Sequence, residues 1–187
     1  MGLDFLEALK SMTTEYLLKR EMEHVLSALT PSNRLVIKTM LRTGMRISDV
    51  LKLKTDDLAN RMWVTESKTN KRRQVGLGNE LLADIKAQAG RTWAFPGVGD
   101  PKKPRTRQAV WWDMKRAAKA FRLPQNVGTH SARKVYAVKL MEKYGDIERV
   151  RRVLSHDNVS TTLMYAMADK LLESRLKGLK RERKAPK

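Results

Sequence analysis

Helix-like patterns run through most of this 187-residue chain and are interrupted at one place by two short apolar runs. Apolar residues at helical spacing, with breaks at Gly and Pro, predict helices. The expected ranges are 15–29, 33–43, 48–53, 79–89, 109–121, 131–144, 147–154, 160–166 and 169–180. Thr13 or Thr14 is placed to cap the first helix and Ser48 the third, whereas Gly44 and Gly90 each end a helix.

The interruption lies at residues 62–65 and 74–77, two apolar runs around a polar connector. This arrangement predicts a β-hairpin, and residues 93–95 (WAF) predict one further short strand. The fold class expected is therefore mainly α with a small antiparallel β-sheet (α+β). Of the adjacent Trp111 and Trp112, which point in different directions, one is expected in the core.

Composition narrows the class of protein. A hydrophobic fraction of 41% with four Trp suffices for a core, and the length fits one domain. The absence of Cys excludes a disulfide scaffold, a thiol nucleophile and Cys-ligated zinc. No apolar run reaches about 18 residues and no signal pattern opens the chain, which favours a soluble, cytoplasmic protein without membrane association.

The charge is large and unevenly distributed. The formal net charge is +19, and residues 61–187 hold 30 of the 39 basic residues but 12 of the 20 acidic ones. Such an excess predicts a polyanionic partner. Nucleic acid is favoured over an anionic membrane, because no helix combines a cationic face with large aromatic residues.

Polar residues stand at places where packing alone would not put them. His130 and Arg133 are three residues apart at a helix start, so that both project to one side. The candidates are Arg46 at the mouth of a short helix, Lys68 in the hairpin connector, His130, Arg133, His156 and Tyr165.

These residues lie in four ordered motifs: 43–53 (TGMRISDVLKL), 67–73 (SKTNKRR), 129–133 (THSAR) and 154–165 (LSHDNVSTTLMY). In order and spacing they resemble the catalytic domain of tyrosine recombinases, the phage integrase family. The resemblance extends from about residue 13 to 170 and implies the tyrosine-recombinase/integrase catalytic-domain fold. It departs from the family at Ser131, Ala132 and Ser155, none of which is a catalytic position.

The resemblance implies a reaction on double-stranded DNA. Arg46 and Arg133 would clamp the phosphate, because guanidinium forks bind anionic oxygens bidentately, and His156 would be a further donor. Tyr165 would attack phosphorus and form a 3′-phosphotyrosine intermediate. His130 would be the base or orient the reacting groups.

Lys68 would protonate the leaving 5′-oxygen, and Lys71 in the same connector competes for this role. Asp49 matches an acidic position that supports the first arginine. A covalent intermediate retains the bond energy, so no cofactor, ATP or metal is expected. A zinc site is also disfavoured, with three His and no Cys in the chain.

The same resemblance predicts how the chain divides into domains. Residues 1–12 form an N-terminal lead-in, 13–170 the catalytic domain, and 171–187 a C-terminal helix end and basic tail, exchanged between the protomers of a DNA-bound tetramer. Family members commonly carry an N-terminal DNA-clamping domain. The chain is therefore either a fragment or a naturally compact recombinase like the fimbrial DNA invertases.

Basic residues outside the catalytic set are expected to contact DNA. They are Lys71, Arg72, Arg73, Lys102, Lys103, Arg105 and Arg107. The expected setting is the nucleoid of a bacterium or archaeon, or a phage-encoded protein, with accessory DNA-bending proteins as further partners.

The leading hypothesis is a site-specific recombinase acting in integration, excision or inversion. Two alternatives remain open at this point: a type IB topoisomerase-like enzyme that relaxes DNA, and a non-catalytic DNA-binding protein built on a recombinase fold.

Overall fold

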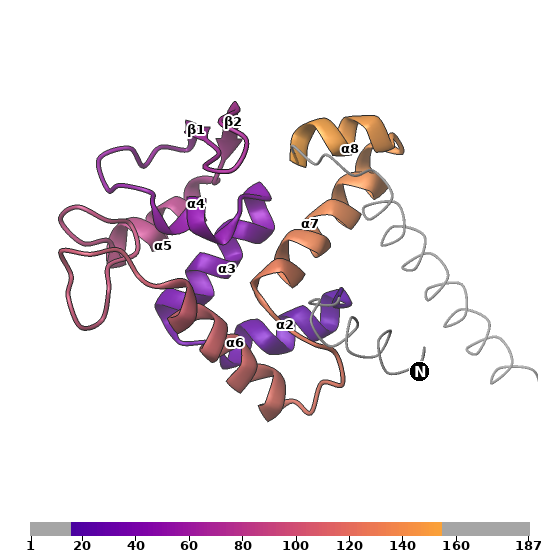
Figure 1. The fold of residues 1–187 in the computed structure, drawn as a ribbon, viewed down its shortest axis with the longest axis horizontal. Coiled ribbons are helices and arrows are strands. Elements are labelled where there is room, and N and C mark those ends of the chain that lie inside the picture. Colours follow the sequence, from indigo (N-terminus) through magenta and orange to yellow (C-terminus); the bar gives the residue numbers. More distant parts are fainter. Residues whose placement is uncertain (1–15, 155–187) are drawn as a thin grey trace, which may run out of the picture. The chain divides into compact units, whose positions relative to one another are not determined.

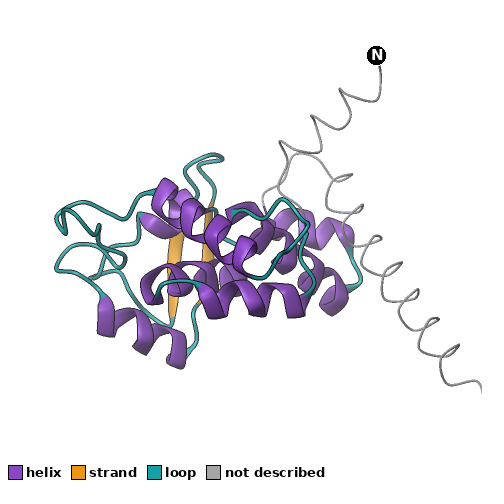
Figure 2. Ribbon diagram, turned by 90° about the horizontal axis from the view of Figure 1, so that it is seen from below, coloured by secondary structure: helices purple, strands orange, loops and turns teal. Residues whose placement is uncertain are grey.

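The computed structural model describes residues 16–154, which are mostly helical with one two-stranded antiparallel sheet. Figures 1 and 2 show how far helix outweighs strand, as the sequence predicted. The elements are α2 (Lys19–Ala28), α3 (Pro31–Thr43), α4 (Ile47–Leu51), β1 (Arg61–Thr65), β2 (Arg72–Gly76), α5 (Asn79–Gln88), α6 (Arg107–Ala120), α7 (Thr129–Tyr144) and α8 (Ile147–Leu154).

The chain divides into two compact units after Tyr136. The described part of the first unit, residues 16–136, holds every element from α2 to α6 and the first half of α7. The described part of the second unit, residues 137–154, consists of the rest of α7 and α8. The helices expected at 160–166 and 169–180 lie outside the described residues.

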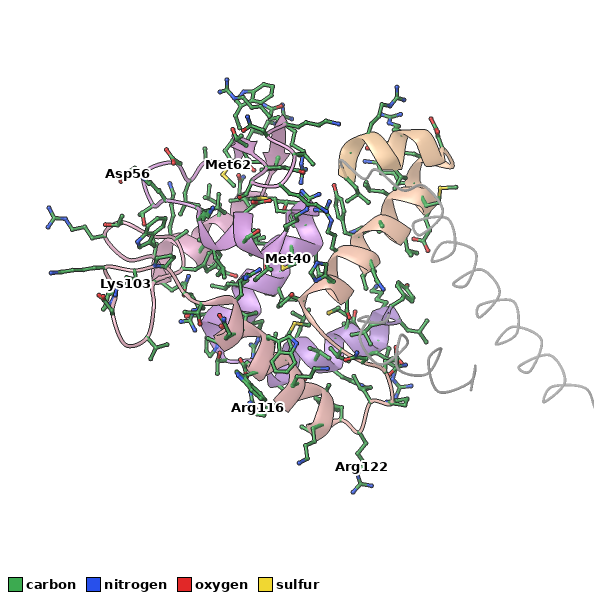
Figure 3. All side chains as sticks on the ribbon, in the orientation of Figure 1. Met40, Asp56, Met62, Lys103, Arg116 and Arg122 are labelled. Carbon is green, nitrogen blue, oxygen red and sulfur yellow. The ribbon has the colours of Figure 1, made fainter. Side chains whose placement is uncertain are left out.

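Helix α3 is the central element of the first unit. It contacts α2, α4, α5, α6 and β2, and Figure 1 shows it in the middle of them. Its buried side chains recur at helical spacing, with Val36, Ile37 and Met40 almost inaccessible to solvent. Met40 points into this interior in Figure 3. The apolar period that predicted the helix therefore also predicted its buried face.

Gly44 ends α3 with a left-handed backbone, at a φ of 66°. Its N–H donates to the carbonyl of Met40 at 2.8 Å, which closes the last turn. A Cβ at this position would overlap the ring of Tyr136. Two independent requirements, backbone conformation and close approach, thus select glycine here.

Five helix starts differ from expectation. Helix α2 begins at Lys19 rather than at residue 15, because the N–H of Leu18 is capped by the Glu21 carboxylate at 2.7 Å. Thr13 and Thr14 lie outside the described residues. Helix α4 starts at Ile47 with Arg46 as its N-cap, not with Ser48. Helices α3, α6 and α7 each begin two residues earlier than predicted, at Pro31, Arg107 and Thr129.

Two aromatic predictions were wrong. Residues 93–95 make a single isolated bridge, Lys54 to Trp93, instead of a strand. Trp111 and Trp112 are 37% and 66% exposed, so neither is in the core. Val110, Met114 and Ala117 take the inward positions of α6 instead. The inward face of α6 is therefore set by the helical spacing of these smaller apolar residues. The two tryptophans, although larger, fall on the other side of the helix.

The hairpin pairs Arg61 with Gly76 and Thr65 with Arg72 at its two ends. Met62, Val64 and Val75 are buried, so one face of the hairpin packs on the core. The connecting turn is closed by two backbone hydrogen bonds, from Glu66 to Lys71 and from Asn70 to Glu66. Asn70 adopts a positive φ of 53°, which asparagine tolerates better than most residues.

We predict that Gly44→Ala lowers the free energy of unfolding by about 2–4 kcal/mol, through backbone strain and overlap with Tyr136. Gly145→Ala serves as a partial control, since Gly145 has a φ of 63° but open space around it, and should cost only about 1–2 kcal/mol. Gly76 has neither constraint, so Gly76→Ala should be nearly neutral. Urea unfolding measures all three, and equal losses for the first two would contradict the packing argument.

Candidate active site

Arg46 lies at the N-cap of α4 and forms an ion pair with Glu66, which directly follows β1. The distance from Arg46 Nη1 to Glu66 Oε2 is 2.5 Å. The Arg46 side chain is 18% exposed and the Glu66 side chain 1%. A buried carboxylate thus holds one edge of a guanidinium that still reaches the surface.

Arg133 lies in the first turns of α7 and is buried. Its Nη1 donates to the carbonyl of Gly44 at 2.5 Å. Gly44 precedes Arg46 by two residues in the chain. Burial, with the nearby charge of Arg46 as a further cause, lowers the pKa of Arg133 to about 10. The guanidinium is still charged at neutral pH. The two arginines predicted to bind phosphate are therefore brought to the same corner of the fold.

Glu66 is the functional residue that the sequence analysis missed. Its Oε2 also accepts a hydrogen bond from Thr69 Oγ1 at 3.1 Å, and its Oε1 accepts from Arg73 Nε at 2.9 Å. Burial opposes ionisation, but the hydrogen bonds from Arg46 and Arg73 outweigh it and lower the pKa of Glu66. The sequence does single out Glu66, because it is the sole acidic residue between Asp57 and Glu80 in a strongly basic stretch.

Asp49 does not make the contact expected from the resemblance. Its Oδ1 accepts from the backbone N–H of Ser67 at 3.1 Å and from Ser67 Oγ at 2.5 Å. Asp49 thereby ties α4 to the start of the hairpin turn, whereas the carboxylate that pairs with Arg46 is Glu66. The support predicted for the first arginine comes from the hairpin and not from its own helix.

Lys68 and Lys71 lie in the turn between β1 and β2, and both are exposed. Ser67 is fixed by Asp49, and Thr69 by Glu66, on either side of Lys68. Both chain neighbours of Lys68 are thus anchored by hydrogen bonds to buried carboxylates.

His130 lies in the first turn of α7, three residues before Arg133, with its side chain exposed at the surface. Its pKa is lowered from the ordinary value of 6.5, first by partial desolvation and then by the positive charges of Arg133, Lys134, Arg46 and Arg107. The imidazole is therefore neutral at neutral pH and able to accept a proton. His156 and Tyr165, the other two catalytic candidates, lie outside the described residues.

The basic residues expected on DNA fall into two groups. Arg73 and Arg105 are turned inward: Arg73 binds Glu66 and the Thr43 carbonyl, and Arg105 donates to Asn33 Oδ1 at 3.1 Å. These two arginines stabilise the fold, which the sequence analysis did not anticipate. The side chains exposed at the surface are Lys71, Arg72, Lys102, Lys103 and Arg107. Lys103 projects outward from its loop in Figure 3.

Residues 16–154 offer neither a metal-binding cluster nor a membrane-spanning helix. This part of the chain contains no group of three His, Cys, Asp or Glu side chains placed to hold a metal ion. None of its helices is both long and apolar enough to cross a membrane.

A mainly helical unit with two neighbouring arginines, a histidine and a lysine-bearing hairpin is of a class suited to binding an anion. Comparison with known proteins identifies the family. Residues 15–171 match the model of the phage integrase family. The integrase of Escherichia phage P2 is 31% identical over 154 residues, which cover 82% of this chain and 43% of that protein. Tyrosine recombinase XerD of Staphylococcus saprophyticus is 26% identical, covering 74% of this chain and 50% of that protein.

Solved structures share the fold. The crystal structure of a lambda integrase dimer bound to a COC′ core site superposes with a TM-score of 0.65 at 20% identity, covering 81% of this chain and 59% of that one. The match of residues 15–171 to the family model, together with the relative at 31% identity, shows that the chain belongs to the phage integrase family of tyrosine recombinases. It spans about half the length of these two relatives.

We predict that Arg107→Ala raises the pKa of His130 toward its ordinary value, because one of the cations that disfavour the imidazolium is removed. An NMR titration of the imidazole protons measures the change. Arg122→Ala is the matched control: Arg122 lies just beyond the opposite end of α6 and points outward in Figure 3. The electrostatic account fails if both variants shift the pKa of His130 equally.

Proposed function

We propose that this chain acts as a site-specific DNA recombinase, which cuts and rejoins double-stranded DNA through a 3′-phosphotyrosine intermediate, without metal or ATP. The observation that carries the proposal is the meeting of Arg46 and Arg133 at the Gly44 corner, beside a hairpin that presents Lys68. Membership of the tyrosine recombinase family supports the same conclusion.

In the proposed reaction the Tyr165 oxygen forms a bond to phosphorus and the bond from phosphorus to the 5′-oxygen breaks. Arg46 and Arg133 stabilise the charge that grows on the two non-bridging oxygens, with His156 as a further donor. The phenol has an ordinary pKa of about 10, so a base must take its proton. His130 suits that task because its lowered pKa keeps the imidazole neutral at neutral pH.

Lys68 is the proposed proton donor to the leaving 5′-oxygen. Rejoining is the reverse: the 5′-hydroxyl attacks the phosphotyrosine and returns its proton, and Tyr165 leaves. Because the phosphotyrosine conserves the energy of the phosphodiester, the cycle consumes no nucleotide. Each protein group ends in the protonation state in which it began.

The proposed partners are double-stranded DNA, three further copies of the chain in a DNA-bound tetramer, and accessory DNA-bending proteins. Within the proposed catalytic domain (13–170), the surface that faces DNA includes the exposed cations around the hairpin and the loop before α6: Lys71, Arg72, Lys102, Lys103 and Arg107. Residues 171–187 are proposed to dock on a neighbouring protomer and couple the active sites.

The decisive experiment traps the covalent intermediate. A pool of nicked duplexes with randomised sequence around the nick is incubated with the protein in EDTA, so that loss of the short strand prevents rejoining. We expect a covalent protein–DNA adduct with wild-type protein, and none with Tyr165→Phe. DNA binding without any adduct would favour the non-catalytic alternative, and relaxation of a plasmid that lacks the captured sequences would favour the topoisomerase alternative.

We predict that Lys68→Ala slows adduct formation by about 10²–10⁴-fold, the range typical of a lost general acid. Lys71→Ala changes a lysine that lies three residues further along the same turn and is also exposed, and it should instead leave the rate of the chemical step unchanged. It should reduce the salt dependence of DNA binding by about one unit of slope. If Lys71→Ala slowed adduct formation and Lys68→Ala did not, Lys71 would be the proton donor.

A further inference from the structure

Among the described side chains of the candidate active site, Glu66 accepts the largest number of hydrogen bonds, and one of its donors is Arg46, which is proposed to bind the phosphate. It accepts hydrogen bonds from Arg46, Thr69 and Arg73 through both carboxylate oxygens. Its side chain is 1% exposed, so water cannot substitute for these donors. A buried carboxylate with these contacts fixes the positions of the three side chains that donate to it.

The contact with Arg46 constrains how that arginine can be used. Glu66 takes the hydrogen bond from Nη1 and leaves the other edge of the planar guanidinium for a second anion. The Arg46 side chain is 18% exposed, so this other edge has access to the surface. An arginine held in this way approaches a phosphate in one orientation, without first losing rotamer freedom.

The same carboxylate also organises the turn that carries Lys68. Thr69 donates to Glu66 Oε2, and the backbone of Glu66 closes the turn through Lys71 and Asn70. Arg73 extends this network to the end of α3, since its Nη1 donates to the Thr43 carbonyl at 3.0 Å. One buried group therefore joins the phosphate-binding corner to the hairpin that carries the proton donor.

We propose that Glu66 is a positioning residue for strand cleavage, which holds the Arg46 guanidinium and the Lys68 turn in a single relative geometry. This inference rests on the proposed function, because cleavage is the reaction that it serves. Glu66 acts through Arg46 and the turn and makes no contact with the DNA itself.

An alternative role is simple neutralisation of buried positive charge, and Arg133 offers a way to separate the two roles. The groups that act on Arg133 are Arg46 and Arg73, which lower its pKa, and Glu66 and Asp49, which raise it. Removing the charge of Glu66 should therefore lower the pKa of Arg133 below about 10 and bring the alkaline loss of activity to lower pH.

The test compares Glu66→Gln and Glu66→Asp on duplexes captured covalently by wild-type protein from the randomised nicked pool. Glu66→Gln keeps the shape but loses the charge. We expect adduct formation to slow by about 10- to 100-fold, the loss typical of groups that orient metal ligands in other enzymes. We also expect the alkaline limb of the pH–rate profile to move to lower pH. Glu66→Asp keeps the charge but is one methylene shorter, so the rate should fall while the alkaline limb stays in place.

Asp113→Asn is the matched control. Asp113 is another buried carboxylate in an arginine network, bound by Arg116, Asn33 and Thr30, and it belongs to a different part of the first unit. Its removal should lower the melting temperature but leave adduct formation within about twofold of wild type, well below that temperature.

The outcomes separate the two proposals. If wild-type protein forms an adduct and both Glu66 variants match it in rate and pH profile while folded by circular dichroism, the positioning role is overturned and the proposed function stands. If wild-type protein forms no adduct, the proposed function fails and this inference fails with it. If Glu66→Gln does not fold, a wild-type rate for folded Glu66→Asp still overturns the positioning role.

Discussion

The first unit depends on a single carboxylate shared between two guanidinium groups. Arg46 and Arg73 lie on either side of Glu66, and all three side chains are largely shielded from water. Charges removed from solvent in this way are tolerated only when each is paired, and loss of one member leaves the others uncompensated. An isolated two-stranded hairpin has little stability of its own. Glu66 and Arg73 supply the polar attachment that fixes this hairpin to the helices.

The Gly44 corner provides the other half of that attachment. Helix ends leave carbonyl groups without intrahelical partners. At the end of α3 the carbonyl of Thr43 accepts from Arg73, and that of Gly44 accepts from Arg133. Positive side chains are favoured there by the helix dipole as well. A helix end therefore serves both as an anchor for the hairpin and as the support for one arginine of the candidate active site.

The sequence predicted the helices and the hairpin because their signals are local: apolar period, a glycine stop and a polar connector. It also predicted that Arg46 and Arg133 belong together, through the order of the family motifs. It did not predict that Glu66 pairs with Arg46, because a hairpin turn and a helix N-terminus 20 residues apart meet only in the folded chain. Arg73 and Arg105 were assigned to DNA for the same reason: composition counts charges but does not show which way they point.

Positive charge in this protein consequently has two uses that the net value of +19 cannot separate. Arg73 and Arg105 hold the fold together, whereas Arg107 is exposed and lowers the pKa of His130. In the proposed reaction, an incoming phosphate would offset the cations that disfavour protonation of that imidazole. The pKa of His130 would then rise while DNA is bound, which strengthens the base at the moment when Tyr165 must lose its proton. In that reaction, the cations that attract the DNA would also make activation of the nucleophile depend on bound DNA.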